Sequence, residues 1–155
     1  MKWVTREKAK VDRIACPWLI HRFVDSDAEF IFVPGKMVME VAKNESAIPF
    51  DIEGAELMHY MDNGEERVTF DAIIRKYNLT DPALLEFAKI VRGADASIPD
   101  APHESPGLEA AALGFREIAK DDHENMKLQF PLYDAMYAYV KQRREGGAKL
   151  AHSGK

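Results

Sequence analysis

The stretch VDRIACPWLIHRF, residues 11–23, separates two short segments, 3–5 (WVT) and 29–33 (EFIFV). The β-branched and aromatic residues of those segments predict strands. The apolar residues of 11–23 could line one face of a continuous helix, but Pro17 would then lie in its interior, at a cost of about 3 kcal/mol. We therefore expect the helix to begin at Pro17, with Cys16 as its N-cap.

Beyond this stretch the pattern changes from extended to helical. Segment 47–52 reads as a weaker strand, and 56–60 begins a hairpin that turns at Asn63-Gly64. Strands thus crowd the first third of the chain, and helices are expected in the remainder. The sequence predicts an α+β fold in which a small sheet is accompanied by a mostly helical remainder.

The spacing of apolar residues predicts four further helices. The first includes Phe70 and has Thr69 as N-cap; the second has Asp81 as N-cap and Pro82 in its first turn, and ends at Gly93. A proline-rich loop, 96–107, precedes the third, which starts near Leu108. Met126 lies in the fourth, in which Pro131 is expected to force a kink or a restart.

Composition sets bounds on the class of protein. The 155 residues suit one domain, which we place at 1–144, followed by a tail at 145–155 that we expect to be disordered. A single cysteine excludes an internal disulfide and a cysteine-rich zinc site. No signal peptide and no membrane-spanning run is recognisable, so we expect a cytoplasmic protein without a membrane partner. The net charge of −5 argues against nucleic acid as a partner.

The helix start at Cys16 allows two kinds of chemistry. The positive end of a helix, with Arg13 nearby, would lower the pKa of a thiol and make it reactive. The alternative is an ordinary small residue at a helix start. The same helix end, together with Arg6 and Lys8, would suit a tetrahedral oxyanion, although such a basic run is also typical of solvated surface.

Several segments together resemble the chromate-resistance protein family, in the part that forms the C-terminal domain of the ChrB proteins. The resemblance extends from Trp3 to about Arg143. It rests on the following segments, in this order: WVTREKAKVDRIACPWLIHRFVDSDAEFIFVP, IPFDIEGAELMH, TFDAIIRKYNLTDPALLEFAKIVRGAD, GLEAAALGF, DDHE and LYDAMYAYVKQ. It implies a link to chromate resistance and chromate sensing.

The resemblance also bears on partners and on the cysteine. In longer relatives an N-terminal region associated with transcriptional regulation precedes this domain, so we expect no nucleic-acid binding by this domain alone. Chromate or another small oxyanion is the expected small-molecule partner, and an oligomer is compatible with the sequence. Similar proteins carry serine where this chain has Cys16, which argues against obligatory thiol chemistry and favours an N-cap.

Polar residues recur among apolar neighbours in the segments that carry the resemblance: Asp12, Asp51, Glu56, His59, Asp71, Asp95, Asp122 and His123. Burying a carboxylate is costly unless it is paired or binds a metal. His59, Asp71 and Asp95 lie at predicted element ends, where side chains from separate segments can converge. We select as candidate ligands of a manganese, iron or zinc ion His59, Asp71, Asp95, Asp122 and His123.

A purely structural explanation stands beside this one, since Asp71 could cap a helix and His123 could be plain surface. For oxyanion binding the candidates are Arg6, Arg13 and Arg92, with Arg92 alternatively paired to Asp95. Three functions stay open: a metal-dependent or redox enzyme of chromate detoxification, a non-enzymatic chromate or metal sensor that acts through a regulatory partner, and a thiol-based protein that uses Cys16.

Overall fold

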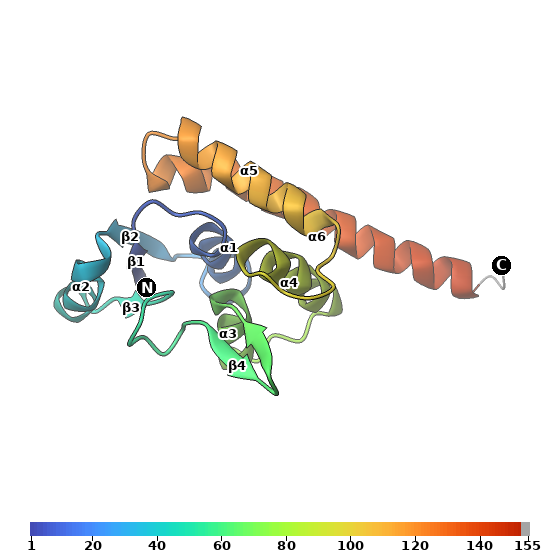
Figure 1. Cartoon of the computed structure of the whole chain (residues 1–155), viewed down its shortest axis with the longest axis horizontal. Helices are drawn as coiled ribbons and strands as arrows, with labels where there is room; N and C mark the ends of the chain where they lie inside the picture. The colour runs from blue at the N-terminus through green and yellow to red at the C-terminus, as the bar shows by residue number, and fades with distance from the viewer. Residues whose placement is uncertain (153–155) are drawn as a thin grey trace.

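The computed structural model describes residues 1–152, with side chains for residues 1–146 (Figure 1). The strands are β1 (Lys2–Arg6), β2 (Glu29–Val33), β3 (Ile48–Pro49), β4 (Tyr60–Asp62) and β5 (Glu65–Arg67). The α-helices are α1 (Asp12–Leu19), α2 (Val38–Glu45), α3 (Thr69–Lys76), α4 (Pro82–Asp95), α5 (Glu104–Ile118) and α6 (Asp122–His152). A π-helical turn, η1 (Ile20–Val24), continues α1, and a 3-10 turn, η2 (Gly35–Met37), precedes α2. The predicted α+β class is confirmed.

Strand β1 is the centre of a three-stranded parallel sheet in the order β2-β1-β3. Its successive side chains point to opposite faces of the sheet. Trp3 belongs to the main core, whereas Val4 packs with Val38 and Ala42 of α2 in a smaller core on the other face. The sheet is therefore covered on both sides, which explains why all three central residues of β1 are fully buried.

The helix after β1 begins at Asp12, so the predicted start at Pro17 is wrong. Pro17 lies inside α1, and Cys16 is a fully buried residue of its middle rather than an N-cap. The helix is held by tertiary contacts: Trp18 lies within 6.0 Å, centroid to centroid, of the rings of Phe87 and Tyr133. The burial of this apolar face offsets the proline penalty that local rules give.

The other predicted elements are found with shifted ends. The hairpin turns at Asn63-Gly64, where both residues have positive φ, as that turn requires. Asp81 caps α4 by accepting the Ala83 N–H, as predicted. Thr69, however, is the first residue of α3 and not its N-cap, and α5 begins at Glu104, within the predicted loop.

The last helix is longer than the sequence pattern predicts. Helix α6 continues through Pro131 to His152 without a restart, so it includes most of the tail that we expected to be disordered; residues 153–155 lie outside the described residues. Figure 1 shows α6 alongside α5 and projecting past the other helices. Along the described part of the chain, no helix combines the length and apolar character that crossing a membrane requires.

Gly93 lies within α4 rather than at its end. A glycine is needed there because the position faces the start of α5 at close range. A Cβ atom there would stand 2.5 Å from the Ser105 Oγ and 2.9 Å from the Ala101 Cβ. The Ser105 hydroxyl cannot easily move, since it is buried and donates a 2.8 Å hydrogen bond to the Ile90 carbonyl.

Gly93→Ala is therefore expected to lower the free energy of unfolding by about 1–3 kcal/mol, as overpacking does. Denaturant titration measures this change. Gly107→Ala is the matched control, because a Cβ at that helical position meets nothing within 4 Å; it should leave stability unchanged or raise it by up to about 1 kcal/mol. Equal effects at both glycines would contradict the tight contact between α4 and α5.

Candidate metal site

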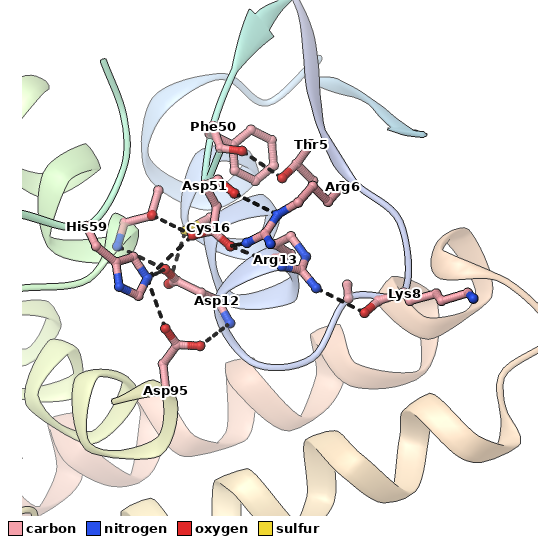
Figure 2. Close-up of polar contacts among 12 residues, drawn as sticks. Thr5, Arg6, Lys8, Asp12, Arg13, Cys16, Phe50, Asp51, His59 and Asp95 are labelled. Atoms are coloured by element: carbon pink, nitrogen blue, oxygen red, sulfur yellow. Dashed lines mark hydrogen bonds and ion pairs between the residues drawn. The ribbon is translucent and has the colours of Figure 1, made fainter. Parts of the chain in front are cut away.

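Three carboxylates from separate segments converge on one ring nitrogen. The Nε2 atom of His59 lies 3.3 Å from an oxygen of Asp12, 3.4 Å from one of Asp51 and 3.2 Å from one of Asp95. Figure 2 shows the side chains of Asp12 and Asp95 pointing toward the His59 ring. One N–H cannot satisfy three acceptors, so the centre of this cluster is suited to a larger positive charge than a proton.

Asp12 is the most deeply buried member of the cluster, with 2% of its side chain exposed. It is the first residue of α1, and its carboxylate also accepts the backbone N–H groups of Thr69 (2.9 Å) and Phe70 (3.3 Å) at the start of α3. These donors belong to the helix end that has no intrahelical acceptor for them. Asp12 thus joins two helix starts and faces His59 from the protein interior.

Asp95 is the last residue of α4 and reaches the same ring nitrogen of His59 from another helix. One of its oxygens accepts the backbone N–H of Asp12 at 3.3 Å, while the other faces the imidazole. The end of α4 and the start of α1 therefore fix each other. With 14% of its side chain exposed, Asp95 lies between the interior and solvent, and His59, at 37%, opens the cluster to solvent.

Asp51 follows β3 and holds the cluster from a third direction. Its backbone has a φ of +53°, an uncommon conformation for a non-glycine residue that is often found at functional sites. Its carboxylate accepts the Thr69 hydroxyl at 3.0 Å and pairs with Arg6 and Arg13, each at 3.5 Å. Because two guanidinium groups already balance it, Asp51 is better placed to orient the cluster than to bind a cation itself.

The electrostatics follow from this arrangement. Hydrogen bonds with the carboxylates, that of Asp12 first, raise the pKa of His59 to about 12. Burial, supported by the charges of Asp95 and Asp51, raises the pKa of Asp12 to about 7. Burial would also raise the pKa of Asp51, but its hydrogen bond with His59 and the charge of Arg13 hold it below its ordinary value. The cluster therefore retains protons at a pH where isolated side chains would lose them.

The geometry fits a bound metal ion. Metal–ligand bonds of about 2.0–2.2 Å place neighbouring ligand atoms about 2.8–3.6 Å apart, from octahedral to tetrahedral coordination. The distances from His59 to Asp12 and to Asp95 fall in that range, and one ligand atom from each of the three residues lies within 4.8 Å of the others. One imidazole and two carboxylates suit zinc, manganese or iron.

Two of the predicted oxyanion ligands lie beside this cluster. Arg13 is largely committed, since its guanidinium pairs with Asp51 and donates to the Lys8 carbonyl at 3.1 Å. Arg6 has 43% of its side chain exposed and borders an open pocket of about 320 Å³, which His59 also lines. Of the three predicted arginines, Arg6 is therefore the one that faces a space next to the cluster.

The structure brings His59 and Asp95 together but places the other predicted ligands elsewhere. Asp71 pairs through both oxygens with Arg92, at 2.8 and 2.9 Å, and accepts the Val68 N–H at the start of α3. Arg92 therefore pairs with Asp71 and not with Asp95, the predicted alternative. The other two arginines, Arg6 and Arg13, pair instead with Asp51.

Asp122 and His123 lie at the start of α6, away from the cluster. Asp122 accepts the backbone N–H groups of Lys8 (2.8 Å) and Ala9 (2.7 Å), and so fixes the loop that leads to α1. The His123 ring stands edge-on to Phe32, 5.4 Å between centroids. Both residues thus have structural partners, and neither reaches His59.

The polar residues among apolar neighbours include three that the selected ligand set omits: the structure brings Asp12 and Asp51 to His59, whereas Glu56 pairs with Lys76. A helix that starts at Pro17, as predicted, leaves Asp12 in the preceding loop, whereas the structure places it at a helix start. Asp51 follows a strand of two residues, too short for periodicity to delimit. The signal was therefore present, but the element ends were misplaced.

Cys16 lies beside the cluster without the features of a reactive thiol. Its Sγ is fully buried and lies 3.4 Å from an oxygen of Asp12. Burial, together with the negative charge of Asp12, raises the pKa of the Cys16 thiol well above its usual range. The reactive-thiolate hypothesis, which required a helix N-terminus at this residue, loses its structural basis.

Comparison with known proteins gives two matches. The chain matches the family model described as ChrB, C-terminal domain, over residues 3–140. It is 30% identical over 146 residues to Protein ChrB of Cupriavidus metallidurans (strain ATCC 43123 / DSM 2839 / NBRC 102507 / CH34), covering 93% of this chain and 42% of that relative. The chain thus spans less than half the length of the curated relative. No solved structure matches it.

Proposed function

Because the chain belongs to the family of the ChrB C-terminal domain, we propose that it is a metal-binding domain that acts in chromate resistance. Asp12, His59 and Asp95 would hold one divalent ion of manganese, iron or zinc. The observation that carries the proposal is the convergence of three carboxylate oxygens within 3.4 Å of a single imidazole nitrogen. Such a concentration of negative charge is stabilised by a cation.

The proposal includes a role for the open pocket beside the cluster. An ion at His59 would offer a Lewis acid for an oxyanion that enters this pocket, and the exposed guanidinium of Arg6 would complement its negative charge. Chromate is the oxyanion that the family link favours. Asp51 would keep Arg6 and Arg13 at this edge of the cluster through its ion pairs.

Calorimetric titration of chelator-treated protein with Mn²⁺ and Zn²⁺ tests the metal site. His59→Ala is expected to weaken binding of the preferred ion at least about 100-fold, or about 2.7 kcal/mol, because it removes one of three ligands. Asp95→Ala should have a similar effect. His103→Ala is the matched control, since His103 is exposed and lies before α5.

Elemental analysis of protein purified without added metal identifies the native ion. Unchanged affinity in both ligand variants, or no binding by the wild type, would contradict the proposal. If metal binds as expected, Arg6→Ala should weaken chromate binding to the loaded protein while leaving metal affinity unchanged. Equal chromate affinity in Arg6→Ala would remove the second part of the proposal alone.

A further inference from the structure

A second pocket, of about 550 Å³, shares no lining residue with the pocket beside Arg6. It is formed by the β4–β5 hairpin, by one face of α4 and by the loop 96–103 that follows α4. This volume is within the range of small-molecule sites. Chain connectivity places it near the cluster, because Met61 in its lining is two residues beyond His59 and Arg92 is three residues before Asp95.

Two cations face this pocket from α4. Lys89 and Arg92 are three residues apart and so share one face of the helix. Arg92 donates to Asp71 through Nε and Nη2, which leaves Nη1 free of those two bonds. Among the residues with described side chains, Lys89 has no carboxylate within 4.0 Å. An ammonium and one guanidinium N–H are therefore available to a carboxylate ligand.

Carboxylates line the pocket from the other two elements. Glu65 and Glu66 come from β5 and Asp100 comes from the loop, whereas both cations come from the helix. Glu65 pairs with Arg67 at 3.1 Å, but Glu66 and Asp100 form no ion pair with any residue whose side chain is described. A ligand that carried negative charge alone would meet repulsion from this side.

Apolar side chains complete the lining, chiefly Met61 and Ile98, with two prolines of the loop. The pocket thus combines cations from the helix, carboxylates from the hairpin and the loop, and an apolar surface, a pattern that suits a ligand with a carboxylate, an ammonium and an apolar body.

We infer that this pocket binds a small apolar zwitterion of dipeptide size, its carboxylate at Lys89 and Arg92 and its ammonium at Glu66 and Asp100. The inference does not depend on the proposed metal site, because none of its contacts involves Asp12, His59 or Asp95.

The probe is the dipeptide Leu-Leu, titrated into the full chain and followed by NMR chemical shifts. Two blocked forms are the matched ligand controls: N-acetyl-Leu-Leu lacks the ammonium, and Leu-Leu amide lacks the carboxylate. Leu-Leu is expected to shift resonances of the hairpin and of residues 89–102, and each blocked form should bind at least about tenfold more weakly. Lys89→Ala should reduce the ratio of the affinities for Leu-Leu and for Leu-Leu amide. Glu66→Ala should reduce the ratio of the affinities for Leu-Leu and for N-acetyl-Leu-Leu.

The protein controls separate this inference from the metal site. Lys127→Ala and Glu40→Ala remove exposed charges on α6 and α2 and should bind Leu-Leu like the wild type. His59→Ala should also retain Leu-Leu binding, even if it loses the metal. The inference is overturned if Leu-Leu causes no shifts at about 10 mM, or if all three ligand forms bind equally.

Discussion

Asp12→Ala is expected to lower the free energy of unfolding by about 2–4 kcal/mol, more than Gly93→Ala. The substitution leaves the buried N–H groups of Thr69 and Phe70 without their acceptor, and each buried donor without a partner costs about 1–3 kcal/mol. Relief of the buried charge of Asp12 offsets part of this loss. Denaturant titration in the presence of chelator measures the change.

Asp12→Asn separates the structural role of this residue from its proposed ligand role. The amide oxygen can accept only one of the two backbone N–H groups, because these bind different oxygens of Asp12; stability should therefore fall by about 1–3 kcal/mol, less than in Asp12→Ala. Metal affinity should nevertheless fall at least about 100-fold, because the charge is lost. Asp27→Ala, at an exposed position, should change neither property. An Asp12→Ala protein as stable as the wild type would show that the start of α3 does not depend on Asp12.

The stability of the metal-free protein is expected to fall as the pH rises from 6.5 to 8. The folded-state pKa of His59 is raised to about 12, above its ordinary value of about 6.5. The folded protein therefore holds a proton that the unfolded chain releases in this range. The stabilisation by this proton is complete below pH 6.5 and declines steadily above it, by at most about 1.4 kcal/mol per pH unit. Solvent screening at the partly exposed ring lowers the folded-state pKa and so shortens the pH range over which the decline continues.

Thermal unfolding at several pH values, with chelator present, measures this slope. His59→Ala should flatten it, whereas His103→Ala should retain it. The range stops at pH 8 because the buried Cys16 thiol, whose pKa is also raised by its burial, would add a slope of the same sign at higher pH. With saturating metal the dependence should reverse, since the ion replaces the proton on His59. A flat profile in metal-free wild type would contradict the imidazolium at the centre of the cluster.

Most helices and strands could be predicted from the sequence because residues close together in the chain determine where these elements begin and end. The Asn63-Gly64 turn needs positive φ at two residues, and Asp81 followed by Pro82 is suited to a helix start wherever it occurs. These predictions are confirmed. The start of α1 could not be found in this way, because contacts with Asp95 and with the start of α3 fix Asp12 in the first turn.

Only part of the site could be predicted, because it also depends on contacts between segments distant in the chain. His59 and Asp95 were placed at element ends, and the structure joins them. Asp71 and Asp122 also lie at helix starts, yet each is occupied by backbone donors, and Asp71 also by Arg92. A carboxylate at a helix start looks the same in sequence whether it caps that helix, pairs with an arginine or faces an imidazole. The partner that decides between these roles comes from a segment distant in the chain.

The two backbone hydrogen bonds that Asp12 accepts from α3 bear on how tightly an ion could be retained. A carboxylate whose charge is already shared with a helix N-terminus has less electron density to give to a cation. We therefore expect Asp12 to contribute less to metal affinity than a carboxylate without these two donors. Occupancy would then follow the supply of metal in the surroundings, as a reversible response requires.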